Sequence, residues 1–219
     1  MEYKNLIGGA ITDKISIYNC DCMELLKQTP DNYYSLSLVD PPYGININIS
    51  IGRRKGDRKS NYKKFAGNDS KIPDKPYFEE LFSVSKNQII WGGNYMTEFL
   101  KPSPCWILWD KGFSESVTFA QFEMAWTSFS SSTKKYDFNA AANNNRIHPT
   151  QKPVALYEWL IKNYAKDNDK ILDTHGGSMS SRIAAHKANL PFMGFELDED
   201  YFKASVKRFE QYTNQTRLF

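Results

Sequence analysis

The chain has 219 residues, of which 41% are hydrophobic and 24% charged, an ordinary composition for one soluble globular domain and too short for two comfortable ones. No stretch approaches the ~20 apolar residues that a membrane helix requires, and the first residues lack an apolar secretion signal, so we expect a cytoplasmic protein without a membrane partner. Three cysteines without a CxxC pair and three histidines indicate reduced thiols rather than a disulfide framework or a metal site.

The net charge of +3 is unevenly placed along the chain. Residues 53–64 hold seven Lys and Arg against one Asp, which leaves 21 basic and 24 acidic residues elsewhere. Such a charge run is either a solvated insertion or an arm that contacts nucleic-acid phosphates, and the two interpretations are compatible because such arms often order on binding. The candidate nucleic-acid contacts are Arg53, Arg54, Lys55, Arg58, Lys59, Lys63 and Lys64.

The first part of the chain alternates in the manner of strands separated by helices and loops. A short helix is expected over residues 21–29 and another before residue 87, while residues 44–75 form a polar, basic loop too long to be idle in a compact domain. The segment 122–130 is expected to form an antiparallel edge strand. The other strands expected here lie at residues 14–19, 34–40, 87–93 and 105–111.

The second part continues the alternation. An amphipathic helix starts at Pro153, where proline suits a helix start, and a strand ending at Asp173 runs into a glycine turn and a further helix. A last strand near residues 191–197 precedes a long helix that we expect to end near Tyr212. The pattern predicts one α/β domain over residues 1–219, with a mostly parallel seven-stranded sheet covered by helices on both faces.

The elbow DPPYG, residues 40–44, ends a predicted strand with residue types that a chain reversal does not need. Asp40 offers an acceptor, and Pro41 and Pro42 give a rigid backbone without a competing donor. The Pro41 carbonyl and the Asp40 carboxylate together can accept from one amino group, and Tyr43 offers a flat face for a base. A purely structural interpretation also exists, because prolines terminate strands and tyrosines pack.

The segment LDTHGGS, residues 172–178, ends another predicted strand with an acid and paired glycines. Glu196 follows Asp173 by 23 residues at the tip of the next strand, which is typical of a nucleoside-cofactor site. A bare strand–turn–helix connection explains the pattern about equally well, and a GxGxxG dinucleotide motif is absent. In a parallel sheet both strand ends face one site.

Several motifs occur together in one order: NCDCMELL (residues 19–26), DPPYG, HPTQKPVALYEWL (148–160), ILDTHGGS (171–178) and GFELDEDYF (194–202). Over nearly the whole chain they resemble the amino-group DNA methyltransferases that act on adenine N6 or cytosine N4, in the permuted group whose DPPY half precedes the S-adenosylmethionine half. The segments IIWGGNY and WILWDK are similar to small phage and prophage members. The resemblance implies a Rossmann-like class I methyltransferase fold.

The resemblance also implies a mechanism and a cofactor site. The target base swings out of double-stranded DNA, donates its amine to Asp40 and Pro41, and stacks on Tyr43, after which the methyl group moves by direct displacement without a metal. Asp21 would contact the cofactor adenine and Glu196 its ribose, while the turn after Asp173, with Thr150 and Lys152, would hold its methionine end. The implied catalytic residues are Asp40, Pro41, Pro42 and Tyr43, and the implied cofactor residues are Asp21, Cys22, Asp40, Thr150, Lys152, Asp173, His175, Gly176, Gly177, Ser178, Glu196 and Leu197.

One position departs from the family pattern. Met179 stands where the family usually has the second glycine of a GSG-like turn, and Gly176 stands where a bulky residue is usual. A positive φ at Met179 would cost roughly 1 kcal/mol or more. We expect Gly176 to compensate by moving the flexible point upstream, so the cofactor site is either weakened or reshaped.

These observations rank the functions. Adenine-N6 DNA methylation is the leading hypothesis, within a phage or prophage restriction–modification setting. Cytosine-N4 methylation is the alternative, although it more often goes with Ser in place of Asp40, and a DNA-binding relative that lost the cofactor is a further one. A protein-amide methyltransferase is expected to carry Asn at that position. The segments 44–75 and 130–146 are the candidates for reading the recognition sequence.

The chain ends in QTRLF, Gln215–Phe219. The spacing Gln-x-x-Leu-Phe is similar to peptides that dock on the bacterial sliding clamp, where glutamine bonds a pocket rim and the Leu-Phe pair fills an apolar pocket. The alternative is that Leu218 and Phe219 fold back on the body. The expected partners are therefore double-stranded DNA and, through this tail, the sliding clamp, with the protein itself a monomer or homodimer.

Overall fold

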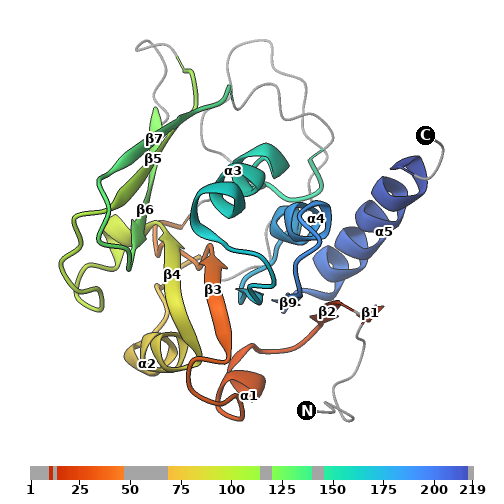
Figure 1. Ribbon diagram of the computed structural model, residues 1–219, viewed down its shortest axis with the longest axis horizontal. Coiled ribbons are helices and arrows are strands. Elements are labelled where there is room, and N and C mark those ends of the chain that lie inside the picture. The colour runs from red at the N-terminus through yellow and green to blue at the C-terminus, as the bar shows by residue number, and fades with distance from the viewer. Residues whose placement is uncertain (1–9, 12–13, 47–68, 114–119, 140–145, 217–219) are drawn as a thin grey trace.

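The computed structural model describes residues 10–11, 14–46, 69–113, 120–139 and 146–216. Within these residues the chain forms one mixed sheet with helices on both of its faces (Figure 1). None of the described helices is both long and apolar enough to cross a membrane. The predicted DNA-contact segment, residues 53–64, lies outside the described residues.

In the described part of the chain the sheet has nine strands in the order β1-β2-β9-β8-β3-β4-β6-β5-β7, and most of its neighbouring pairs are parallel. The prediction of a mostly parallel α/β sheet is confirmed, but the predicted count of seven strands is wrong because two short strands, β1 and β7, extend the edges. The strands are β1 (Ala10–Ile11), β2 (Ile15–Tyr18), β3 (Tyr34–Val39), β4 (Ser85–Trp91), β5 (Trp106–Asp110), β6 (Phe122–Thr127), β7 (Lys134–Asp137), β8 (Ile171–Asp173) and β9 (Phe192–Phe195).

Strand β6 is antiparallel, as expected, but the prediction that it forms an edge is wrong. It lies between β4 and β5 and pairs antiparallel with both. Because β6 runs against its neighbours, its first residues lie beside the carboxyl ends of β4 and β5, with Phe122 opposite Asp110 and Ala125 opposite Trp91. The start of β6 therefore reaches the same edge of the sheet as the strand tips that carry the motifs.

The helices divide between the two faces of the sheet, with α1 and α2 on one side and α3, α4 and α5 on the other (Figure 1). Their ends follow local signals: the Asp74 side chain accepts a hydrogen bond from the backbone of Tyr77 to cap α2, and Pro153 directly precedes α3. The helical segments are α1 (Met23–Leu26), α2 (Lys75–Val84), the 3₁₀ turn η1 (Gly93–Tyr95), α3 (Val154–Tyr164), α4 (Ser180–Lys187) and α5 (Glu199–Thr216).

Helix α5 runs to Thr216, so the expectation that it ends near Tyr212 is wrong. Residues 213–216 contain neither Gly nor Pro, and the hydroxyl of Thr213 donates to the carbonyl of Glu210 one turn earlier. The half-buried Tyr212 also packs against the core and holds the last turns. Gln215 is therefore part of the helix, whereas residues 217–219 lie outside the described part of the chain.

Alternate residues of the central strands fill two apolar cores, one on each face of the sheet. In β4, Ile89 and Trp91 join the core beneath α3, α4 and α5, while Ile90 joins the core beneath α1 and α2. Burial on both faces is the expected environment of parallel strands. The pairings of β3 with β8 and of β8 with β9 bring the tips of these strands to one edge of the sheet.

Candidate active site

A pocket of about 730 Å³ lies at the carboxyl edge of the parallel strands. It is lined by the residues that follow β2, β3, β8 and β9, together with part of the HPTQKP segment and the start of β6. Every predicted catalytic residue and every predicted cofactor residue except Asp173 lines this pocket. The sheet therefore brings the two strand ends, DPPYG and LDTHGGS, together at one pocket, as the sequence predicts.

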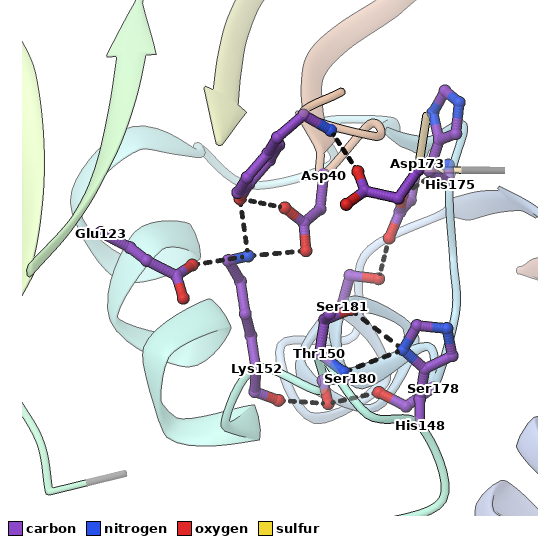
Figure 2. Close-up of polar contacts among 12 residues, drawn as sticks. Asp40, Glu123, His148, Thr150, Lys152, Asp173, His175, Ser178, Ser180 and Ser181 are labelled. Atoms are coloured by element: carbon purple, nitrogen blue, oxygen red, sulfur yellow. Dashed lines mark hydrogen bonds and ion pairs between the residues drawn. The ribbon is translucent and has the colours of Figure 1, made fainter. Parts of the chain in front are cut away.

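At one end of the pocket, Lys152 lies between two carboxylates (Figure 2). Its Nζ is 2.6 Å from Oδ2 of Asp40, 2.9 Å from Oε2 of Glu123 and 3.1 Å from the hydroxyl of Tyr43. The Tyr43 hydroxyl donates to Oδ1 of Asp40 at 2.6 Å. Both carboxylate oxygens of Asp40 are thus engaged, one by tyrosine and one by lysine.

The charges of this cluster are set by burial and mutual attraction. Burial raises the pKa of Asp40, while the nearby Lys152 opposes the rise. Burial alone would lower the pKa of Lys152, but attraction by Asp40 and Glu123 raises it, so the ammonium group stays charged. Burial likewise favours neutral Glu123, yet Lys152 and Lys111 outweigh it and lower the pKa of Glu123 to about 2.

Tyr43 sits in a slot made by the turn after β4. Gly92 there has φ +68°, and a Cβ at this position would lie 2.2 Å from Cε1 of Tyr43, so only glycine leaves space for the ring. The ring stacks on Tyr95 with centroids 5.4 Å apart and planes 17° apart. Oδ1 of Asp69 accepts from the backbone amides of Tyr43 and Gly44 at 2.8 and 3.3 Å, which fixes the elbow.

At the other end of the pocket, two carboxylates are held by backbone amides. Glu196 accepts from the amides of Gly177 at 2.6 Å and Asp198 at 2.8 Å, and Asp21 accepts from the amide of Met23 at 2.9 Å. Each carboxylate keeps further lone pairs for hydroxyl or amino donors. Leu197, 73% exposed, gives the rim an apolar surface for a flat ring. These residues fit the adenosyl part of S-adenosylmethionine.

Asp173 is the one predicted cofactor residue that does not line the pocket, and the prediction that it contacts the cofactor is not supported. Its side chain is buried and accepts from the hydroxyl of Ser181 and from the backbone amide of His175. Burial raises its pKa to about 7. Asp173 therefore holds the glycine turn from behind, which is why it does not face the pocket.

Met179 adopts the left-handed conformation that its place in the turn demands, with φ +51° and ψ +44°, and its side chain is buried. The positive φ that would strain a methionine at this position is therefore present. The predicted compensation is different, because the left-handed residues of the turn are Gly177 and Met179, not Gly176. A Cβ on Gly176 would lie 2.8 Å from Cγ and Cε of Met179. Gly176 thus gives room to the methionine side chain.

The HPTQKP segment contributes differently from the prediction. Lys152, expected at the carboxylate of the cofactor, instead points to Asp40 and Glu123. The Thr150 hydroxyl and amide contact Nδ1 of His148 at 3.1 and 3.3 Å. Burial and the nearby Lys152 lower the pKa of His148 to about 4, so this imidazole is neutral near pH 7.

Several pocket residues were missed by the sequence reasoning. Among them, Glu123 could have been found from the sequence, because an acid near the start of an otherwise apolar strand is unusual. The strand was expected at the edge of the sheet, so this acid was not expected at the pocket. Tyr157 and Tyr201 occur in the motifs HPTQKPVALYEWL and GFELDEDYF, but the sequence analysis assigns no role to either tyrosine. The missed pocket residues that shape the site are Asp69, Tyr77, Glu123, His148, Tyr157 and Tyr201.

The family model described as DNA methylase, for enzymes acting on N6 or N4 amines, matches residues 83–207, more than half of the chain. The chain belongs to this family of amino-group DNA methyltransferases. Because the family depends on S-adenosylmethionine, S-adenosylmethionine is the cofactor that the pocket takes.

Individual relatives are more distant. YubD of Escherichia coli (strain K12) is 24% identical over 215 residues, which cover 86% of this chain and 87% of YubD. Among solved structures, the PvuII DNA methyltransferase (cytosine-N4-specific) matches with a TM-score of 0.63 and 16% identity over 90% of this chain and 87% of its own. The M1.HpyAVI–SAM complex matches with a TM-score of 0.58 and 20% identity over 89% and 99%. At these identities the two structures establish the shared fold alone.

Proposed function

We propose that the protein is a site-specific DNA methyltransferase that modifies the exocyclic N6 amine of an adenine flipped out of double-stranded DNA. The observation that carries the proposal is the placement of Asp40 at a strand tip, in the same pocket as the backbone-held acids Asp21 and Glu196. One end thus offers acceptors for an amine, and the other offers acceptors for a nucleoside. Asp rather than Ser at position 40 favours adenine over cytosine.

The residues of the chain act by positioning and by electrostatics. S-adenosylmethionine, when bound, supplies an electrophilic methyl group. Asp40 and the Pro41 carbonyl accept hydrogen bonds from the amine, which turns the nitrogen lone pair out of the plane of the base. The amine that accepts this methyl group would lose one proton to solvent. Tyr43, whose hydroxyl donates to Asp40, offers its ring as the stacking face for the base.

The same proposal assigns DNA contacts to the basic segment. Neutralising Arg53, Arg54, Arg58 and Lys59 together should weaken DNA binding and flatten its salt dependence by up to about four phosphate contacts, with cofactor affinity unchanged. Binding measured by fluorescence anisotropy over a salt series checks this expectation. An unchanged slope of log affinity against log salt would leave the segment a solvated insertion.

The tail is proposed as a tether to the sliding clamp, which would raise the local enzyme concentration at newly made DNA. Gln215 is exposed near the end of α5, and the motif continues to Phe219. Purified clamp should be recovered by the intact protein and not by a chain that lacks residues 215–219. Equal recovery from both proteins contradicts the proposal.

The proposed activity is tested by incubating the protein with duplex DNA of mixed sequence and S-adenosylmethionine, then digesting the DNA to nucleosides for mass spectrometry. We expect N6-methyladenine, and sequencing that detects modified bases should show it in one sequence context. If the product is N4-methylcytosine, the target base is cytosine rather than adenine, and the proposed mechanism still applies. If heat of cofactor binding and methylated product are both absent, the protein is a non-enzymatic relative.

A further inference from the structure

The carboxylate of Glu123 faces the DPPY elbow from a strand that belongs to neither motif half. It lies near the start of β6, opposite Trp109 of β5, and β6 runs antiparallel to β4. Its Oε1 is 2.6 Å from Nζ of Lys111 and its Oε2 is 2.9 Å from Nζ of Lys152. Glu123 is therefore fixed between two lysines, one of which also pairs with Asp40 (Figure 2).

The resting site contains a conflict that Glu123 can resolve. Asp40 must accept from the amine of the base, yet each of its oxygens already accepts a short bond of 2.6 Å, one from Tyr43 and one from the charged Lys152, which holds the carboxylate toward the lysine. Withdrawing Asp40 from Lys152 would strand an ammonium group that is only 3% exposed, and an unpaired buried charge is strongly unfavourable. A second carboxylate on Lys152 removes this obstacle, because the ammonium group keeps a partner.

We propose that Glu123 is a positioning residue for methyl transfer, which retains Lys152 when Asp40 turns one oxygen from the lysine to the amino group of the target base. The inference rests on the proposed function, because it needs an amine in the pocket. Glu123 acts through Lys152 and makes no contact with the base. Lys111 holds the second oxygen of Glu123 and keeps its carboxylate turned to the pocket.

The pH dependence of transfer gives a readout that a merely structural role would not move. The titratable groups that face Asp40 are Tyr43, Glu123, Lys152, Tyr157 and Asp173. Of these, Glu123 repels the charged form of Asp40 and Lys152 attracts it. Removing the charge of Glu123 therefore lowers the pKa of Asp40. Because ionised Asp40 is the acceptor, the acid limb of the rate profile should move to lower pH.

The test compares Glu123→Gln with the matched control Glu158→Gln, which removes an acid that pairs with Lys187 on the surface, away from the pocket. Single-turnover transfer to duplex DNA is measured at saturating cofactor from pH 5 to 9. We expect Glu123→Gln to lower the rate by about ten- to a hundredfold, to move the acid limb to lower pH and to leave cofactor affinity within about twofold. The control should match the unmodified protein.

A double-variant cycle isolates the action through Lys152. In a Lys152→Met background, Glu123→Gln should have little further effect on the rate, because the partner that it retains is gone. Glu123→Asp keeps the charge with a shorter side chain, so it should lower the rate and leave the acid limb in place. If Glu123→Gln does not fold, it shows no heat of cofactor binding in calorimetry. Glu123→Asp then serves as the test variant in its place.

The outcomes separate this inference from the proposed function. If the unmodified protein transfers no methyl group to DNA, the proposed function fails. If it is active and Glu123→Gln, or Glu123→Asp where Gln does not fold, has the unmodified rate, only the role of Glu123 is overturned. Equal effects of Glu123→Gln with and without Lys152 also overturn it.

Discussion

The two ends of the pocket are built by different means. The end at Asp40, where we propose that the base binds (the base end), is assembled from side chains distant in sequence, and the opposite end is the proposed cofactor end. Asp40, Glu123 and Lys152 come from three separate segments and balance one another's charge. The cofactor end is assembled from local turns, in which backbone amides hold the carboxylates of Asp21 and Glu196. On the proposed function, amine chemistry would depend on long-range charge balance, whereas nucleoside binding would depend on turn geometry. Substitutions at the base end should therefore lower the rate of methyl transfer, whereas substitutions at the cofactor end should lower the affinity for the cofactor.

The largest effect is expected at the base end. Asp40→Ala should reduce single-turnover methyl transfer by at least about a hundredfold, because the amine loses its charged acceptor, while the cofactor dissociation constant stays within about twofold. Transfer of a labelled methyl group to duplex DNA and isothermal calorimetry measure the two quantities. A loss of no more than about tenfold, near 1.4 kcal/mol, contradicts the role of Asp40.

A smaller effect, on binding, is expected at the cofactor end. Glu196→Gln should weaken cofactor binding by about ten- to a hundredfold, because a hydrogen bond to a charged group contributes about 1.5–3 kcal/mol. The amide can still accept from Gly177, so the turn should persist. Calorimetry at pH 7.5 measures the change, with Glu158→Gln as the surface control. Unchanged affinity would show that Glu196 serves the turn and not the ligand.

Features built from local segments, such as the cofactor end, could be predicted from the sequence, whereas features built from distant segments could not. The alternation of strands and helices and the acids at strand tips are encoded within short segments, so the α/β fold and the pocket residues at the strand tips could be predicted. The contact between Glu123 and Lys152 depends on inserting β6 between β4 and β5, which no local pattern specifies. The short strands β1 and β7 form only through their neighbours, for the same reason.

Met179 and Gly176 should behave as a coupled pair. Met179→Gly relieves left-handed strain of roughly 1 kcal/mol but removes a buried side chain, so we expect a net loss of about 1–3 kcal/mol in unfolding free energy. Gly176→Leu alone should clash with the side chain of Met179 and with the carbonyl oxygen of Phe195, and Met179→Gly relieves only the first of these clashes. The double variant should recover at least about 1 kcal/mol relative to the sum of the single effects, measured by denaturant unfolding. If the effects of the two substitutions on the free energy of unfolding are additive, residues 176 and 179 are not coupled.

The smallest effect concerns Asp173, whose folded pKa is raised to about 7 by burial. A folded pKa above the usual acid value of about 3.9 means that the folded state binds the proton more tightly than the unfolded state. This group therefore contributes less stability as pH rises from about 4 to 7. Asp173→Asn should flatten the fall in melting temperature between pH 5 and 8. A variant with the unmodified pH dependence would contradict the raised pKa.

The division of labour between the two ends is tested most directly by rescue with cofactor. Single-turnover methyl transfer to duplex DNA is measured for Asp40→Ala and Glu196→Gln as the S-adenosylmethionine concentration is raised to saturation. We predict that Glu196→Gln regains a rate within about threefold of the unmodified protein, while Asp40→Ala stays at least about a hundredfold slower at every concentration. If saturating cofactor rescues both variants or neither, the two ends do not act separately.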